Sequence, residues 1–483
     1  MNLIVALFLL AGSAPAHESA HDSARSTIDQ AYQLLRKGHG AQAAAVLKAA
    51  RDKDPREPAL HLAYQSTMYD IGKYDEVRKD YKKRLKANRK DGLAYLLYAL
   101  TVIPRKEAEA LVDEGLRADP DNVWLKSAKS MTSAYHLIDQ GREDEALKLA
   151  YDPAAPGMIA PVVHSVRAGA FYGQGRFEMA IAEFMAAFDE NPSDIASRLG
   201  LAQLYADMSD YDKALPLCRE ALLLHDGPET RYALANAMYI MGKPVEARKK
   251  YKEIAAMRPV SAGDYEAVGW AQLALGNTTE STHSFIEIET ISQGYDAPKL
   301  DLAYLKATVF GAKTARERYD ELLRRNPRGA NARLGSGLDY MGLGNFQEAR
   351  DEFKKVLADN PKSWNAWMGQ GYSDMRLGRR EEGIKELLEA FKLMPDNYDV
   401  NRSLGSGYNA MKRYDDSLKY YVRASQIDPE SADAFAGLAG AYAWAGQHES
   451  AVKAYEQAIS LSASRTDKRQ YAQWLETEKT RAR

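Results

Sequence analysis

The sequence predicts an all-α fold, an elongated array of about 12-13 helical hairpins that follow one another along the chain. Three observations predict it. At 483 residues the chain exceeds the usual size of one globular core, so it forms several domains or a repeat array. Prolines recur at one spacing, with Pro327, Pro361, Pro395 and Pro429 each 34 residues apart. Between these prolines the same residue types return at the same places.

Each unit, counted from three residues after its proline, holds small, aromatic and glycine residues at fixed positions. The eighth residue is small, as in Ala168, Ala202, Gly269, Ala303, Gly337, Gly371, Gly405 and Ala439. The fifteenth is often glycine, as in Gly175, Gly276, Gly344, Gly378 and Gly446. The twenty-fourth is large, as in Phe184, Tyr319, Phe353, Tyr421 and Tyr455. The spacing of the apolar places predicts two amphipathic helices per unit. Glycine ends the first helix in a left-handed turn, and the proline ends the second.

These residues resemble the tetratricopeptide repeat family, and the resemblance covers nearly the whole chain after residue 23. Among its members the chain is most similar to multi-repeat exported proteins of bacterial type. We delimit units at 24–57, 58–88, 89–122, 123–160, 161–194, 195–227, 228–261, 262–295, 296–329, 330–363, 364–397, 398–431 and 432–465. The resemblance implies a right-handed α-α superhelix (a TPR solenoid), whose first helices line the concave side where partners commonly bind.

The chain divides into five predicted segments. Residues 1-16 contain a short apolar run and the Ala14-Pro15-Ala16 form of a cleavage site, which predicts a signal peptide. The alternative is an uncleaved start, because no Lys or Arg precedes the apolar run. Residues 17-23 are expected to be a flexible N-terminus. Residues 24-160 and 161-465 form an N-terminal and a C-terminal repeat block, separated by a kink in a Pro/Gly/Ala run. Residues 466-483 predict a polar capping helix, which repeat arrays need.

Two residues depart from the repeat pattern. Asp374 stands where other units have an aromatic residue, and Lys412 stands where glycine is usual.

Composition and motifs favour binding over catalysis. The formal net charge is -2, with 65 basic against 67 acidic residues, so a nucleic-acid partner is not expected. The single cysteine, Cys218, excludes an intrachain disulfide. The sequence has no phosphate-binding loop and no C-x-x-C pair. Its one H-E-x-x-H match, His17-Glu18-Ser19-Ala20-His21, lies in the stretch that is expected to be a flexible tail. Gly335-Ser336-Gly337 and Gly405-Ser406-Gly407 fall on first helices and are interpreted as packing positions. We therefore expect no enzyme activity, no cofactor and no metal site.

The predicted binding surface consists of the second, fifth, ninth and twelfth places of each unit, which in this family point into the concave groove. Large apolar residues occupy many of them, and such residues on a surface usually mark a binding site. The candidates are Tyr232, Tyr239, Trp270, Tyr304, Leu338, Met341, Tyr372 and Met375. The alternatives are that several pack inward, or that the register is off by one. Arg402 and Asn409 also face the groove, but no Lys stands four residues before an Asn as in the family's carboxylate-capturing grooves.

The leading functional hypothesis is an exported, periplasmic scaffold that holds a partner protein or peptide, such as an amphipathic helix, in this groove. The alternative is a component of an envelope polysaccharide assembly or export system, working with a separate outer-membrane barrel. An enzyme that uses the repeats as a targeting arm has little room, because the repeats take up almost the entire chain. The partner and the oligomeric state are not encoded in any motif.

Overall fold

The computed structural model describes residues 24, 26–31, 33–34, 39–70, 73–101, 105–151, 160–190, 195–259, 262–291, 319–320, 323–324, 330–462 and 464–482. Throughout these residues the regular structure is α-helical, which confirms the all-α prediction. The helices of the first half are α3 (Gly40–Lys53), α4 (Pro58–Asp70), α5 (Tyr74–Ala87), α6 (Gly92–Ala99), α7 (Arg105–Ala118), α8 (Val123–Asp139), α9 (Glu143–Tyr151), α10 (Ala160–Gly173), α11 (Phe177–Glu190), α12 (Ile195–Asp207) and α13 (Tyr211–Leu224). Those of the second half are α14 (Pro228–Ile240), α15 (Pro244–Ala255), α16 (Ala262–Ala274), α17 (Thr278–Ile291), α20 (Ala330–Gly342), α21 (Phe346–Asp359), α22 (Trp364–Arg376), α23 (Arg380–Leu393), α24 (Tyr398–Ala410), α25 (Tyr414–Ile427), α26 (Ala432–Trp444), α27 (His448–Leu461) and α28 (Arg465–Arg481).

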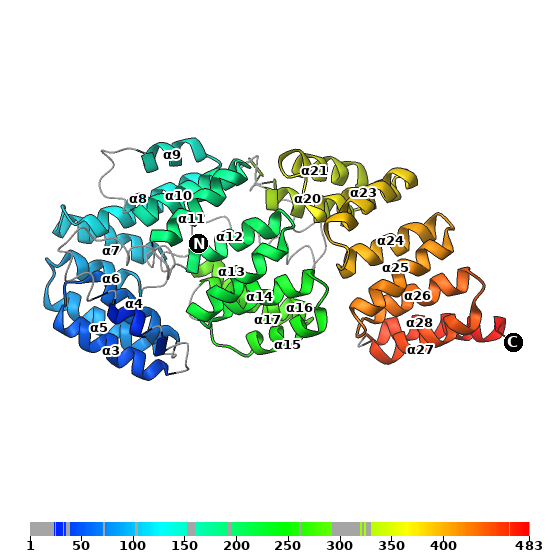
Figure 1. The fold of residues 1–483 in the computed structure, drawn as a ribbon, viewed down its shortest axis with the longest axis horizontal. Helices are drawn as coiled ribbons and strands as arrows, with labels where there is room; N and C mark the ends of the chain where they lie inside the picture. The colour runs from blue at the N-terminus through cyan, green and yellow to red at the C-terminus, as the bar shows by residue number, and fades with distance from the viewer. Residues whose placement is uncertain are drawn as a thin grey trace.

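Consecutive helices pair as hairpins, and successive hairpins stack into a curved array (Figure 1). In the stacked hairpins the first helices also touch each other, as α20, α22, α24 and α26 do in sequence. The first helices therefore form one layer and the second helices another, which is the arrangement of a helical-repeat superhelix.

Left-handed residues end the first helix of many hairpins, as the glycine pattern predicted. Gly242, Gly276 and Gly344 have φ of +81°, +82° and +79°. Lys412, the departure noted above, adopts φ 60° in the same turn, and so does Ser209 with φ 59°. The hairpin geometry thus holds even where the residue lacks glycine's freedom, because the flanking helices fix the turn.

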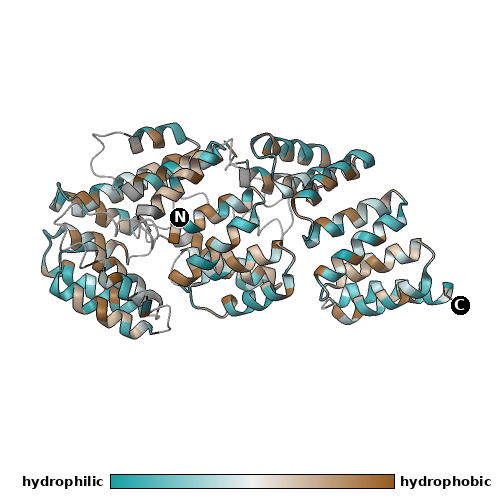
Figure 2. Ribbon diagram, viewed as in Figure 1, coloured by the Kyte–Doolittle hydropathy of each residue, from teal (hydrophilic) through white to brown (hydrophobic). Residues whose placement is uncertain are grey.

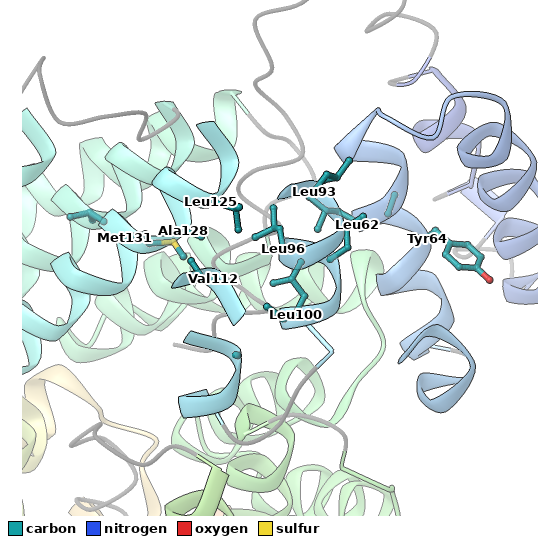
Figure 3. Packing of buried hydrophobic residues seen from close by; sticks show 14 of the residues in the cluster. Leu62, Tyr64, Leu93, Leu96, Leu100, Val112, Leu125, Ala128 and Met131 are labelled. Atoms are coloured by element: carbon teal, nitrogen blue, oxygen red, sulfur yellow. The ribbon is translucent and has the colours of Figure 1, made fainter. Parts of the chain in front are cut away.

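The core runs along the array between the two layers. Figure 2 shows that the helices carry apolar and polar residues side by side, as amphipathic helices do. In the N-terminal part the buried side chains form a continuous row across α4, α6, α7 and α8 (Figure 3). This row includes Leu62, Leu93, Leu96, Leu100, Val112, Leu125, Ala128 and Met131.

Glycines let an aromatic ring from a second helix fit between two first helices. A Cβ atom added to Gly337 on α20 would lie 2.7 Å from the ring of Phe353, and one added to Gly369 on α22 would lie 2.5 Å from it. Tyr421 fits between Gly405 and Gly437 in the same way. The two Gly-Ser-Gly segments are therefore packing positions, as interpreted from the sequence. The large side chain at the twenty-fourth place of a unit therefore packs against the small residue at the eighth place of the same unit.

The array ends with α28, which covers most of the stretch where the sequence predicted the capping helix. Tyr471 and Leu475 are buried against the hairpin before it, while most of its other side chains are exposed. None of the described helices is long and apolar enough to cross a membrane.

Candidate functional site

The candidate site is the surface formed by the first helices, because these helices lie side by side and present matching places of each unit. Of the predicted groove residues, two are exposed: Leu338 on α20 at 41% and Tyr372 on α22 at 37%. Five others are half-buried, namely Tyr232, Tyr239, Trp270, Met341 and Met375. Tyr304 lies outside the described residues.

The half-buried aromatic residues pack one side of their rings on neighbouring helices. Tyr232 of α14 lies 5.8 Å, centroid to centroid, from Tyr251 of α15. Trp270 of α16 meets Phe285 of α17 edge-on at 5.0 Å, a favourable aromatic geometry. These residues therefore contribute both to the core and to the surface. Neither full exposure in the groove nor complete packing into the core describes them.

Tyr372 has a different environment on the C-terminal helices. Its ring lies 6.4 Å from Phe346, and the Arg376 guanidinium lies 4.8 Å from the Phe346 ring and 5.9 Å from the Tyr372 ring. Arg376 also donates a 3.2 Å hydrogen bond to the Tyr372 hydroxyl. The result is an exposed aromatic and cationic surface, the kind of composition that is enriched in binding hot spots.

Acidic side chains share this surface with the aromatic residues. Glu229 lies on α14 at the second place of its unit. Glu266 lies on α16 at the fifth place of the following unit. Burial, followed by the charges of Asp264 and Glu266, raises the pKa of Glu229 to about 7. Glu266 is exposed on the same surface. These carboxylates are not among the predicted groove residues, although they stand at groove places, because the prediction rests on large apolar side chains.

Arg402 and Asp399 of α24 form an ion pair across one helical turn, with 3.6 Å between Arg402 Nη2 and Asp399 Oδ1. Burial raises the pKa of Asp399, and the Arg402 charge opposes that rise. Arg402 is thus engaged by a carboxylate of its own helix. A site built to capture a free carboxylate would need a guanidinium that is available for it.

Within the described parts of the chain, no group of three or more His, Cys, Asp or Glu side chains is placed to hold a metal ion. Cys218 is buried, and burial raises the pKa of its thiol to about 11, so it is an unreactive core residue.

Comparisons with known proteins identify the type of repeat. Sequence patterns of the tetratricopeptide repeat match residues 166–229 and 334–401, and a second pattern of the same repeat matches residues 408–466. A curated relative, the Hsp70-Hsp90 organising protein of Plasmodium falciparum, is 27% identical over 100 residues. That match spans 21% of this chain and only 16% of the relative.

A solved structure shares the fold over most of the chain. The Cut9-Hcn1 hetero-tetramer of the APC/C includes a chain that is 13% identical and matches with a TM-score of 0.54, covering 93% of this chain and 95% of that one. A tetratricopeptide repeat protein from Parabacteroides merdae is 16% identical, with a TM-score of 0.39, 60% of this chain covered and 99% of that one. At 13% identity the likeness to the Cut9-Hcn1 chain concerns the fold alone.

Proposed function

Since this chain is a tetratricopeptide repeat protein, we propose that it is an exported, non-enzymatic scaffold that holds a protein or peptide partner in its concave groove. The observation that carries the proposal is the exposed surface around Leu338 and Tyr372, on neighbouring first helices of one layer. Exposed apolar side chains that gather on one surface usually mark a site where a partner binds.

The partner that fits this surface best is an amphipathic helix or extended segment with basic residues. Its apolar face would cover Leu338 and Tyr372, as in other helix-in-groove complexes. Its basic residues would pair with Glu229 and Glu266, two carboxylates at groove places of α14 and α16. Related support comes from the partial match to a protein named as an organiser of Hsp70 and Hsp90.

A matched pair of leucines on one hairpin tests the groove. Leu338 and Leu343 are each 41% exposed, but only Leu338 occupies a groove place. Both Leu338→Ser and Leu343→Ser should leave the melting temperature nearly unchanged, since exposed substitutions cost within about 0.5 kcal/mol. The wild type should capture partners from an envelope fraction. Leu338→Ser and Tyr372→Ser should each weaken this binding by about 1 kcal/mol or more in binding free energy. Equal loss with Leu343→Ser, or no loss with any variant, would mean that the partner binds elsewhere.

Export is proposed from the N-terminal sequence, which lies outside the described residues. Cleavage after Ala16 would leave His17 as the first residue of the mature protein. Mass spectrometry of the native protein, together with cell fractionation, tests this. A native N-terminus at Met1 or Asn2, or a purely cytoplasmic location, would reject it.

A further inference from the structure

The middle of the array touches its C-terminal part through contacts that bridge about 150 residues of sequence. Asn360, in the loop before α22, donates a 2.7 Å hydrogen bond from Nδ2 to the backbone oxygen of Asp207 at the end of α12. The Ser209 hydroxyl, in the turn after α12, donates to the backbone oxygen of Lys362 in that loop. The turn of one hairpin therefore meets the loop before another that lies 153 residues later.

The same contact repeats one hairpin further along. Asn397, which caps α24, donates from Nδ2 to the backbone oxygen of Ile240 at the end of α14, at 3.2 Å. In the adjoining turn, Gly242 lies so close to the backbone oxygen of Asp396 that an added Cβ atom would collide with it. The repetition shows that two stretches of the array are aligned along their length, as Figure 1 shows for α14–α16 beside α24–α26.

An ion-pair fork continues this line of contacts. Arg248 of α15 lies 2.8 Å from Asp428, measured from Nη2 to Oδ2, and its Nη1 also pairs with Glu430. The Asp428 side chain is only 6% exposed, so this pair is largely shielded from solvent. Charge pairs in such an environment are stronger than pairs on an open surface.

Apolar side chains fill the interface behind these polar contacts. Tyr211 and Ala214 of α13 and Ala237 of α14 belong to one buried cluster with Trp364 of α22 and Leu404 of α24. Partly buried residues from both sides surround the cluster, and they are Tyr205, Ala206, Leu215, Ile240, Met241, Trp367, Met368, Met375, Leu388, Phe391, Leu393 and Met411. A shared core of this kind makes the contact more than a chance approach of two surfaces.

We infer that these contacts form an intramolecular clasp, which holds the array closed and covers part of the predicted groove at Tyr239. The clasp consists of residues 207–214, 237–242 and Arg248 on one side, and of residues 360–364, 396–404 and 428–430 on the other. Tyr239 directly precedes the Ile240 carbonyl that Asn397 binds, and it is half-buried. Burial is the main cause that raises the pKa of its hydroxyl, and the next is the charge of Asp399 on α24.

Closing the clasp therefore competes with binding at this end of the groove. A partner that contacts Tyr239 must displace α24, and it gains affinity when the clasp opens, by population shift. The competition matters only if the groove binds a partner, as proposed above, whereas opening of the clasp is measurable without any partner.

Two glycines with nearly equal backbone angles isolate the clasp. Gly242→Ala and Gly276→Ala place alanine at φ of +81° and +82°, so both carry the same left-handed strain. Of the two, Gly242 faces another part of the array, whereas no atom of the described residues lies within 4 Å of a Cβ added to Gly276. Arg248→Glu gives a second test, with Lys249→Glu as its control, since Lys249 is the exposed next residue on α15. Adding Glu430→Arg to Arg248→Glu should restore one ion pair.

A disulfide trap measures the closed state in the full-length chain. With cysteines at positions 209 and 362, mild oxidation should give an intramolecular cross-link, because the Ser209 hydroxyl contacts the backbone of Lys362. Native Cys218 is buried, and each single-cysteine variant controls for it. Gly242→Ala and Arg248→Glu should slow cross-linking on the order of tenfold and enlarge the radius of gyration in small-angle X-ray scattering. Gly276→Ala and Lys249→Glu should do neither.

Hydroxyl-radical footprinting then tests the covering of Tyr239. Oxidation of Tyr239 should rise severalfold in Arg248→Glu and fall back on adding Glu430→Arg, while Tyr232, which packs on Tyr251, should not change. Absence of the cross-link in the wild type, or equal behaviour of Gly242→Ala and Gly276→Ala, would overturn the clasp. If the clasp opens but the oxidation of Tyr239 does not rise, the inference that the clasp covers this part of the groove is wrong. Partner capture by Leu338→Ser tests only the proposed function. Its outcome does not affect the cross-linking or the footprinting of Tyr239, which test the clasp.

Discussion

Asp374 offers the sharpest test of how this array tolerates a departure from its repeat pattern. It stands on α22 at the place of an aromatic residue, and its side chain is fully buried. Arg350 of the preceding hairpin donates from Nε to both carboxylate oxygens, at 2.9 and 2.8 Å. Arg379, in the turn after α22, donates to Oδ1 at 3.1 Å. We predict that Asp374→Ala destabilises the C-terminal hairpins strongly.

The magnitude follows from the exposure of the two arginines. Removing one partner of a buried ion pair costs roughly 3–5 kcal/mol, because the remaining charge loses its compensation. Here the Arg350 and Arg379 side chains keep 24% and 45% exposure, so water partly solvates them once the carboxylate is gone. We therefore expect a loss of about 2–3 kcal/mol for Asp374→Ala. Asp374→Leu should cost less, because it refills the space with an apolar side chain.

Hydrogen exchange followed by mass spectrometry measures this locally in the intact array, where a single melting temperature averages over many hairpins. In Asp374→Ala, the free energy of opening should fall by about 2–3 kcal/mol for peptides from α21, α22 and α23. It should not change for peptides from α3–α8. Asp351→Ala is the control, because Asp351 is exposed and neighbours Arg350 in the sequence; it should change stability by about 0.5 kcal/mol or less. If Asp374→Ala costs no more than Asp351→Ala, the ion-pair reasoning is wrong.

Two further predictions concern packing and pH. Gly440→Ala should stabilise the last hairpin by about 0.5–1 kcal/mol, because its nearest neighbour, the Tyr455 hydroxyl, lies 3.9 Å from an added Cβ atom. Gly437→Ala, one turn earlier on α26, should cost roughly 1–3 kcal/mol in a denaturant melt, because the Tyr421 ring occupies that space. For Glu229, burial raises the folded-state pKa from 4.5 to about 7, so the folded protein keeps a proton that the unfolded chain releases. The wild type should therefore lose stability relative to Glu229→Gln as the pH rises from 4.5 to 7, with no further change beyond this window; a pH-independent difference would contradict that assignment.

The sequence alone determined the fold of this protein, because the information for it is local and repeated. A helical hairpin needs an apolar stripe on each helix, a left-handed residue at the turn and small residues where the helices approach, and all three recur at one period. The close-packed places, such as Gly337 against Phe353, were predicted for the same reason. The groove places could also be assigned, since they follow from the position within each unit. Their partner could not, because no repeated residue encodes it.

Only the tertiary structure decided the features that join different units. The sequence marked Asp374 as unusual, but its partner Arg350 belongs to another hairpin, and no spacing rule connects them. The structure also showed that Tyr232 and Trp270 serve the core and the surface together. The contact of Arg248 with Asp428 depends on the small rotation between one repeat unit and the next, summed along the chain between them. Such a sum is set by side-chain packing at each interface, so a repeat pattern that predicts each hairpin well still leaves open which distant hairpins meet.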